Sequence, residues 1–307
     1  MKHAYVFPGQ GAQAVGMGKD LYDNVPEAKE LFEKANEILG FRITDIMFAG
    51  TDEELKQTKV TQPAVFLHSV IMAKALGVKP DAAAGHSLGE FSALVVAGAL
   101  SFEDGLKLVS KRALAMQAAC EAQPGTMAAI LGLDDKTVED ICASIDGVVV
   151  AANYNCPGQL VIGGEKAAVD KAAALAKEAG ARRCIPLKVS GPFHTRLMAP
   201  AGDALAKRFA SEPFGEMQVP VLFNCLGREK AEQDSIPALL VKQVQSSVYM
   251  EDTLHRLGEL GVDHILEVGP GSALAGFVKK TLPGVVCASV ETPEQLSAAL
   301  TAWKEEL

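Results

Sequence analysis

The sequence lacks the features of several large classes of protein. Lys and Arg number 29 against 38 Asp and Glu, so the net charge is −9, and no block of like charge stands out. No stretch approaches the roughly 18 consecutive apolar residues of a membrane-spanning helix. No internal repeat or low-complexity segment is visible. Because an acidic chain is a poor partner for nucleic acid or an anionic membrane, we expect neither as a partner.

Cysteine is scarce, and its spacing excludes two further classes. The six cysteines lie at least 14 positions apart, with no C-x-x-C and no nearby pair of histidines. Neither a zinc site nor a disulfide framework is indicated. The four apolar residues before Pro8 are too few for the apolar region of a signal peptide. We therefore expect a soluble protein of a reducing cytoplasm.

The chain is long and apolar enough for a substantial core. Its 307 residues are 49% hydrophobic and 22% charged. The length is about twice the roughly 150 residues that are typical of one domain. Isolated mini-folds and intrinsic disorder are excluded. One large domain, or a large domain with a smaller insert, is expected.

Strand and helix signals alternate over most of the chain. A short apolar run at 4–7 ends in Pro-Gly-Gln-Gly, which is typical of a buried strand followed by a loop. This alternation predicts an α/β fold with a mostly parallel sheet. The expected strands are 4–7, a small-residue strand after Asp81, 219–224 and 264–268. The expected helices are one whose start is marked by Asn24 and Pro26 and whose end is marked by Gly40, one at 63–76, one that follows the glycine-flanked turn and runs through Ala97, one from the capping box of Ser101 and Asp104 to about Cys120, and one after Gly271.

The pattern changes between Pro124 and Ser190. The order of signals there is β-α-β-β-α-β, which is the ferredoxin-like arrangement. We expect a small domain at 121–189, inserted into a large domain made of 1–120 and 190–307. The expected strands are 127–131, 148–153, 160–163 and 184–189, and the helices are 136–144 and 166–179.

The sharpest chemical feature is Gly85-His86-Ser87-Leu88-Gly89. It fits the G-x-S-x-G nucleophile elbow, whose glycines permit a tight strand-to-helix turn that exposes the serine oxygen. The N-terminus of the following helix would stabilise negative charge near that oxygen. The alternative is a serine in an ordinary packing turn.

A serine nucleophile needs a base, and His194 is the best candidate among six histidines. It lies in the loop Val189-Ser-Gly-Pro-Phe-His-Thr195, where the inserted domain rejoins the large one, and sites tend to lie at such seams. His68, His255 and His264 lie in patterned segments, where a structural role is expected. No Asp or Glu stands out as the third member, so a distant carboxylate or a backbone carbonyl must orient the imidazole.

Taken together, the motifs resemble those of the malonyl-CoA:acyl carrier protein transacylases of bacterial fatty acid synthesis. The resemblance covers essentially the whole chain. It implies an α/β-hydrolase-like large domain interrupted by a ferredoxin-like small one. The motifs, in order, are Phe7-Pro-Gly-Gln-Gly-Ala-Gln13, Gly85-His-Ser-Leu-Gly-Glu90, Lys111-Arg112, Pro192-Phe-His-Thr195, Lys242-Gln-Val244 and Glu267-Val-Gly-Pro-Gly271.

The resemblance also implies a role for individual residues. Ser87 is implied as the nucleophile, His194 as its base, and the backbone carbonyl of Gln243 as the group that orients the histidine. The implied oxyanion hole consists of the backbone N–H groups of Gln10 and Leu88. Arg112 is implied as the clamp on the free carboxylate of the substrate, and a guanidinium can offer that carboxylate two parallel donors.

Three departures from the family's usual pattern occur outside the catalytic positions. Ala12 stands where serine is common, and Gly191 stands where alanine is common. Ser247 and Met250 replace a usual Pro and Trp, which affects the backbone expected around Gln243.

The implied reaction moves a malonyl group from malonyl-CoA through a malonyl-serine to the phosphopantetheine thiol of holo acyl carrier protein. No metal or other cofactor is required, and a monomer is expected. A serine thioesterase or esterase with the same elbow is the first alternative. A dinucleotide-binding module is the second, because Gly9-Gln-Gly11-Ala-Gln-Ala14 fits G-x-G-x-x-A weakly.

The carrier poses an electrostatic problem. Acyl carrier proteins are typically acidic, so an enzyme of net charge −9 needs a local basic patch to bind one. The candidates are Arg182, Arg183, Lys188, Lys279 and Lys280.

Overall fold

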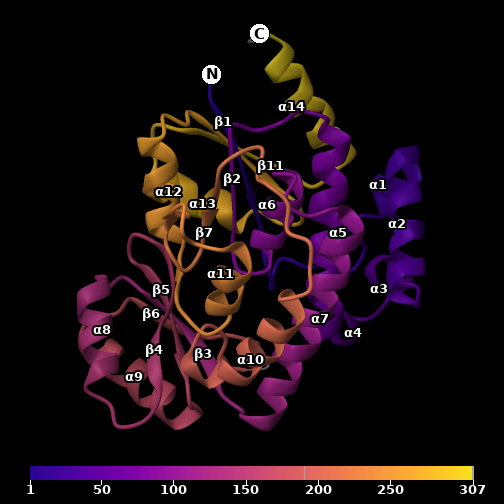
Figure 1. The fold of residues 1–307 in the computed structure, drawn as a ribbon. Helices are drawn as coiled ribbons and strands as arrows, with labels where there is room; N and C mark the ends of the chain where they lie inside the picture. The colour runs from indigo at the N-terminus through magenta and orange to yellow at the C-terminus, as the bar shows by residue number, and fades with distance from the viewer. Residues whose placement is uncertain (190, 306–307) are drawn as a thin grey trace. The chain divides into compact units, whose positions relative to one another are not determined.

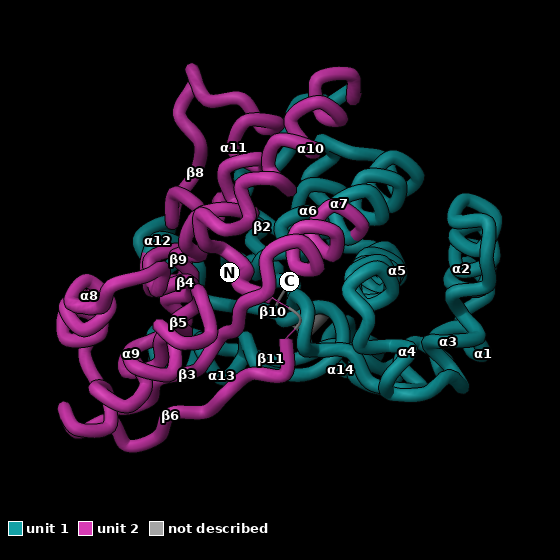
Figure 2. The backbone as a smooth tube through the Cα atoms, turned by 90° about the horizontal axis from the view of Figure 1, so that it is seen from below, with its two compact units in different colours: residues 1–113, 213–222, 256–307 teal, residues 114–212, 223–255 magenta. Residues whose placement is uncertain are grey.

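The computed structural model describes residues 1–189 and 191–305 (Figure 1). The chain forms two compact units, shown in two colours in Figure 2. Unit 1 consists of Met1–Ala113, Pro213–Leu222 and Arg256–Leu307, and unit 2 of Leu114–Glu212 and Phe223–His255.

Unit 1 is built around a parallel sheet in which β11, β10, β1, β2 and β7 are neighbours in that order. Strands β1 and β2 are buried along almost their whole length, so apolar residues occur at consecutive positions and do not alternate with polar ones. The predicted α/β class with a mostly parallel sheet is confirmed. The strands are β1 (His3–Phe7), β2 (Ala82–Gly85), β7 (Val221–Phe223), β10 (His264–Val268) and β11 (Val286–Val290).

Helix α5 is the most buried helix of unit 1, and α2, α3 and α4 pack against it (Figure 1). It begins at Thr58, five residues before the predicted start at Pro63, because tertiary packing buries the turn that precedes the proline. The helices are α1 (Lys19–Asn24), α2 (Pro26–Leu39), α3 (Ile43–Ala49), α4 (Asp52–Lys56), α5 (Thr58–Leu76), α6 (Gly89–Val96), α13 (Ala273–Thr281) and α14 (Pro293–Glu305).

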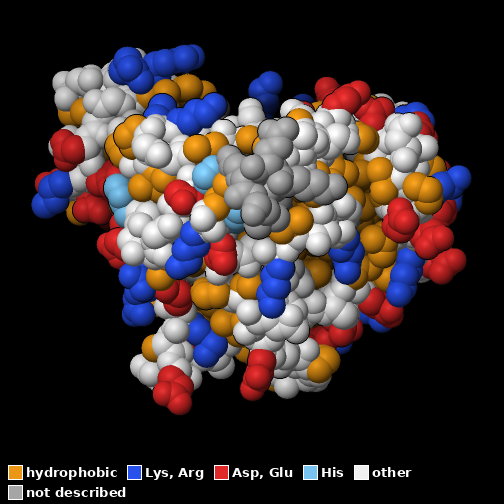
Figure 3. Space-filling view, turned by 90° about the horizontal axis from the view of Figure 1, so that it is seen from above, with side chains coloured by type: hydrophobic (Ala, Val, Ile, Leu, Met, Phe, Trp, Pro, Cys, Tyr) orange, Lys and Arg blue, Asp and Glu red, His pale blue; other side chains and the backbone are white. Residues whose placement is uncertain are grey.

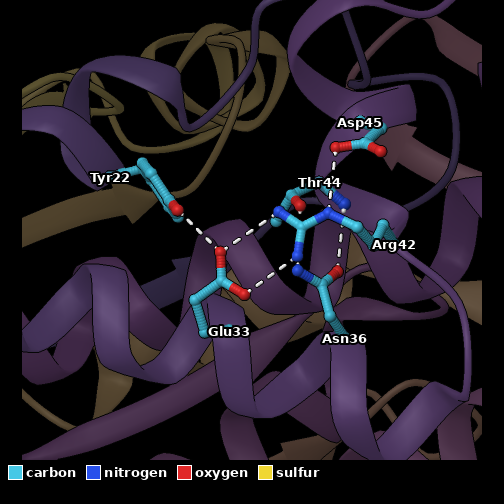
Figure 4. A network of polar contacts seen from close by, with 6 residues as sticks. All are labelled: Tyr22, Glu33, Asn36, Arg42, Thr44 and Asp45. Carbon is cyan, nitrogen blue, oxygen red and sulfur yellow. Dashed lines mark hydrogen bonds and ion pairs between the residues drawn. The ribbon is translucent and has the colours of Figure 1, made fainter.

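A polar network joins the first helices of unit 1 (Figure 4). The guanidinium of Arg42 donates two hydrogen bonds to Glu33, at 3.0 and 3.2 Å, and one to Asp45. The hydroxyl of Tyr22 donates to the same Glu33 carboxylate at 2.6 Å. These donors lower the pKa of Glu33 to about 2. The bidentate contact joins the middle of α2 to Arg42, the residue before α3.

Unit 2 contains a second sheet, with the strand order β6-β3-β5-β4-β9. Strands β3 to β6 and helices α8 and α9 follow one another as β-α-β-β-α-β, and neighbouring strands of this set are antiparallel. Both helices pack on one face over an apolar cluster that includes Ile130 and Ile162. The elements are β3 (Thr126–Leu131), α8 (Asp135–Ala143), β4 (Val149–Cys156), β5 (Gln159–Gly164), α9 (Lys166–Glu178), β6 (Arg183–Pro186) and β9 (Val248–Tyr249).

The predicted insert, 121–189, lies inside unit 2, which also contains 114–120 and parts of the chain after 190. The proposed domain boundaries therefore stay a prediction. In the described ranges, no helix combines the length and apolarity needed to cross a membrane. The remaining elements are α7 (Phe102–Ala122), the 3₁₀ turn η1 (Arg196–Met198), α10 (Ala199–Phe209), β8 (Arg228–Glu229), α11 (Ile236–Gln243) and α12 (Met250–Glu259).

Candidate active site

Ser87 lies in the sharp turn between β2 and α6, as the motif predicts. Its φ is +52°, and that of His194 is +59°; among the described residues, no other non-glycine residue has a positive φ. Such a conformation costs about 1–3 kcal/mol and persists only where the surrounding structure imposes it. The two residues predicted to do the chemistry are therefore the two strained non-glycine positions of the described chain.

Three glycines allow the backbone segments around Ser87 to approach closely. A Cβ at Gly85 would lie 2.0 Å from the carbonyl carbon of Gly89, and one at Gly89 would lie 2.1 Å from the carbonyl oxygen of Phe7. A Cβ at Gly9 would lie 2.4 Å from the carbonyl oxygen of His86. Any larger residue would force these segments apart, so the glycines determine the position of the elbow against the loop after β1.

The backbone N–H groups of Gln10 and Leu88 belong to these two touching segments. The position of a Cβ on Gly9 is 3.6 Å from the backbone nitrogen of Leu88, which brings the two segments side by side. Neither N–H donates a hydrogen bond to another residue within 1–189 and 191–305. The side chain of Gln10 donates to Thr58 Oγ1 at 3.2 Å. The two N–H groups therefore lie on backbone segments that touch beside Ser87, and their role as an oxyanion hole stays a prediction.

Arg112 is completely buried, 0% exposed, and it contacts Ser87 directly. Its Nη1 donates to Oε1 of Gln62 at 2.7 Å, and its Nη2 donates to Ser87 Oγ at 3.1 Å. The guanidinium lies 5.5 Å from the centre of the Phe91 ring. Burial lowers the pKa of Arg112 to about 10, and the charge of Glu90 opposes that effect. Arg112 therefore stays charged at neutral pH.

Sequence reasoning missed Gln62 and Phe91, which hold the guanidinium in place. Gln62 lies on α5 and Phe91 on α6, whereas Arg112 lies on α7. No local pattern marks a glutamine in an apolar helix as a partner of an arginine 50 positions away. Only the packing of the three helices brings these side chains together.

His194, in unit 2, is 3% exposed and is oriented by a backbone carbonyl. Its Nδ1 lies 2.8 Å from the carbonyl oxygen of Gln243, at the C-terminal end of α11. Because a carbonyl can only accept, Nδ1 carries the proton and Nε2 is left as the acceptor. This is the tautomer that a general base needs. The structure thus pairs the imidazole with the carbonyl that the resemblance implied.

The turn that carries His194 is held by its neighbours. Thr195 Oγ1 donates to the carbonyl of Pro192 at 2.7 Å and accepts from the N–H of Leu197. A Cβ at Gly191 would lie 2.1 Å from Sγ of Cys120, so a larger residue there would force the Cys120 side chain to shift. The glycine that replaces the family's common alanine therefore leaves room for the Cys120 thiol.

The segment that carries the Gln243 carbonyl is held at two points. The side-chain amide of Gln243 donates to Oδ1 of buried Asn224 at 3.3 Å, which sequence reasoning did not identify. Ser247 Oγ donates to the carbonyl of Ala151 at 2.7 Å and ties the end of this segment to β4. Ser247 therefore provides a side-chain anchor where the family commonly has proline.

The other predicted histidines make structural contacts. His68, in α5, donates from Nε2 to the carbonyl of Glu291 at 3.0 Å, and burial lowers its pKa to about 4. Nδ1 of His264 lies 2.7 Å from the Asp263 carboxylate. His255 is half exposed on α12.

The dinucleotide-binding alternative does not fit the loop after β1. A G-x-G-x-x-A fingerprint must open a helix whose N-terminus binds the pyrophosphate. Here 8–18 form turns and irregular structure, and α1 begins only at Lys19. The glycines of this loop instead serve the close contacts with the elbow.

The motif Glu267-Val-Gly-Pro-Gly271 packs against the same loop. A Cβ at Gly269, where φ is +133°, would lie 3.0 Å from the Pro8 ring and 2.2 Å from Ser69 Oγ. Glu267 accepts a hydrogen bond from the N–H of Ala275 at 2.8 Å and so caps α13. Its carboxyl group is buried, and this burial raises its pKa to about 7.

Glu267 should make stability depend on pH. A folded-state pKa of about 7, raised from 4.5, means that its protonated form stabilises the fold below pH 4.5 and that this stabilisation is lost as pH rises through 7. The loss is about 3 kcal/mol. His68, whose pKa is lowered, acts in the opposite direction. Only the comparison of Glu267→Gln with the wild type therefore isolates the carboxyl group.

We expect Glu267→Gln to gain stability relative to the wild type between pH 4.5 and 8, by about 3 kcal/mol. Urea unfolding of both proteins at several pH values measures the difference. A constant difference across this range would contradict the assigned titration of Glu267.

Comparison with known proteins assigns the chain to a family. Residues 4–297 match the family model of the acyl transferase domain, so the chain belongs to that family. The malonyl CoA-acyl carrier protein transacylase of Bacillus subtilis (strain 168) is 43% identical over 311 residues, covering 99% of this chain and 98% of that protein. The resemblance noted in the sequence motifs is confirmed.

Solved structures of related proteins have the same fold. The malonyl CoA-acyl carrier protein transacylase of Clostridium perfringens superposes with a TM-score of 0.95 at 40% identity, covering 100% of this chain and 98% of that chain. A complex of a type II PKS acyl-carrier protein with its malonyl-transacylase gives a TM-score of 0.95 at 38% identity, covering 98% and 100%.

Proposed function

We propose that this chain transfers a malonyl group from malonyl-CoA to the phosphopantetheine thiol of acyl carrier protein through a malonyl-serine at Ser87. The observation that carries the proposal is the 3.1 Å contact between Ser87 Oγ and the buried guanidinium of Arg112. A nucleophile beside a fixed, desolvated cation suits an acyl group that ends in a carboxylate. The names of the chain's relatives support the same reaction.

In the first half-reaction, Ser87 Oγ attacks the thioester carbonyl and passes its proton to Nε2 of His194. The negative charge on the carbonyl oxygen is stabilised by the N–H groups of Gln10 and Leu88, and the carbonyl of Gln243 stabilises the imidazolium. The C–S bond then breaks, and His194 returns the proton to the departing CoA thiolate. Arg112 binds the free carboxylate of the malonyl group throughout.

In the second half-reaction, the phosphopantetheine thiol gives its proton to His194 and attacks the malonyl-serine ester. The ester C–O bond breaks, and Ser87 recovers the proton from His194. The net result is one thioester exchanged for another, so no oxidant or reductant takes part. A thioesterase with the same elbow would instead admit water at this stage.

The finer architecture belongs to the same proposal. We infer a large α/β-hydrolase-like domain of 1–120 and 190–307, and a ferredoxin-like small domain of 121–189. The β-α-β-β-α-β succession and the antiparallel pairing of β3 with β5 and β6 support the second assignment. The six free thiols support a reducing cytoplasm as the compartment.

Intact-protein mass spectrometry after brief exposure to malonyl-CoA tests the reaction. We expect one malonyl adduct, located at Ser87 by peptide mapping, that disappears when holo carrier protein is added and reappears on the carrier. An adduct that water removes as fast as the carrier does would favour the thioesterase. Absence of any adduct would exclude the proposed intermediate.

A further inference from the structure

Three buried polar side chains lie near the beginning of α5, the most buried helix of unit 1. Thr58, Thr61 and Gln62 are 2%, 0% and 1% exposed. Burial of a polar group costs free energy unless the group forms a hydrogen bond, so the partner of each side chain shows what it does. By contrast, acidic and basic side chains are mixed over the surface shown in Figure 3, where water solvates them. The buried polar groups of α5 are therefore the more specific feature.

Thr58 and Gln62 hold two different groups of the candidate active site. They are four positions apart on α5, so they lie on the same face of the helix. Oγ1 of Thr58 accepts a hydrogen bond from the side-chain amide of Gln10 at 3.2 Å. Oε1 of Gln62 accepts a hydrogen bond from Arg112 at 2.7 Å. One face of α5 therefore contacts both the loop after β1 and the guanidinium beside Ser87.

The hydrogen bond to Thr58 anchors a loop that has no regular secondary structure. In 8–13, the N–H groups of Gly11 and Ala12 donate to acceptors inside the same segment, whereas the side chain of Gln10 reaches α5. Gly11 has a φ of +106°, and a glycine leaves the backbone beside it free to rotate. A hydrogen bond from Gln10 to a buried helix limits this freedom and so fixes the direction of the Gln10 N–H.

The two anchored groups would bind the two ends of a malonyl group. In the proposed mechanism, the N–H of Gln10 binds the oxyanion and Arg112 binds the free carboxylate. A single methylene separates the thioester carbonyl from that carboxylate, so the two donors must be held at a constant spacing. Side chains on one face of a helix keep such a spacing, because the helix rises by a constant ~1.5 Å per residue. Helix α5 is therefore suited to support both donors.

We propose that Thr58 is a positioning residue that holds the oxyanion donor Gln10 through its side chain. The role depends on the proposed function, which assigns the oxyanion to the N–H of Gln10. An oxyanion forms in the transition state and not in the bound substrate, so loss of the hydrogen bond should lower kcat and leave KM nearly unchanged. Loss of either partner, Thr58 or the Gln10 amide, should have the same effect.

The Thr58→Val variant tests this role in single-turnover experiments, because it keeps the branched side chain and removes the acceptor. At saturating malonyl-CoA, we expect malonyl-enzyme formation to slow about 10- to 100-fold, less than the roughly 10²- to 10³-fold lost when an oxyanion donor is removed. Acetyl-CoA should slow by the same factor, because it has the same thioester carbonyl. Thr58→Ser, which restores the hydroxyl, should recover most of the wild-type rate.

Gln10→Met removes the other partner and retains the backbone N–H. We expect it to slow the reaction by the same factor as Thr58→Val, and it tests the role even if Thr58→Val fails to fold. The double variant Gln10→Met/Thr58→Val should be no slower than the slower single variant, because the same hydrogen bond is lost in all three. Effects that multiply in the double variant would show that Thr58 does not act through Gln10.

Thr61→Val is the matched control, because it makes the same substitution on the same helix. The hydroxyl of Thr61 donates to the backbone carbonyls of Leu55 and Gln57 and not to the loop after β1. We expect a lower melting temperature and a wild-type kcat. Equal slowing by Thr61→Val, or no slowing by Thr58→Val, would overturn the role of Thr58. Failure of the wild type to form a malonyl-enzyme would instead overturn the proposed function.

Discussion

The Ser87→Ala variant should form no malonyl adduct and should lose transferase activity by about 10⁴-fold or more, the scale seen when a serine nucleophile is removed. The hydroxyl is the only atom removed, and the strained turn at φ +52° is retained. Arg112 keeps its hydrogen bond to Gln62, so the carboxylate site should survive. Stopped-time assays with malonyl-CoA and carrier protein, together with intact-mass measurement, give both readouts.

Ser92→Ala is the matched control for this experiment. Ser92 lies on α6, five residues after Ser87, and is buried; its Oγ has no hydrogen-bond partner among the residues that the structure describes. Removing an unsatisfied buried hydroxyl is neutral or stabilising. We expect full activity and an unchanged or higher melting temperature. If Ser87→Ala kept a stable malonyl adduct while Ser92→Ala lost it, the nucleophile would be misassigned.

The second large effect is expected at Arg112. Arg112→Lys keeps a positive charge but loses the planar fork that donates to Gln62 and Ser87 at once. Breaking a buried, hydrogen-bonded charge pair costs about 2–5 kcal/mol, so kcat/KM for malonyl-CoA should fall about 30- to 5,000-fold. Acetyl-CoA has no carboxylate to lose, so its kcat/KM should change little. The ratio of the two kcat/KM values is the measurement.

Lys111→Met is the control for Arg112, because Lys111 is its exposed neighbour on α7. It removes a charge one residue away without entering the site. We expect both kcat/KM values to match the wild type. An Arg112→Lys enzyme that keeps the wild-type preference for malonyl-CoA would show that another group recognises the carboxylate.

Local signals in the sequence predicted much of the fold. The apolar run at 264–268 coincides with β10, and Pro26 and Gly40 mark the start and end of α2. The short strand β9 and the helices α10 to α12 were not predicted. Strand β9 has only two residues, and it exists because it pairs with β4 almost a hundred positions earlier. A pairing of that kind leaves no periodicity to detect.

The sequence by itself determined the chemistry that this protein can carry: a serine between glycines, a histidine in a Pro-Phe-His-Thr loop, and one arginine after a lysine. This chemistry depends only on residue types a few positions apart, so short sequence motifs are enough to predict it. Tertiary structure alone decided how each group is held. The guanidinium of Arg112 is fixed by Gln62 from another helix, and Nδ1 of His194 by the carbonyl of Gln243, 49 positions away. Burial lowers the pKa of Arg112, and the carbonyl of Gln243 sets the tautomer of His194. Both effects arise only when distant segments pack together.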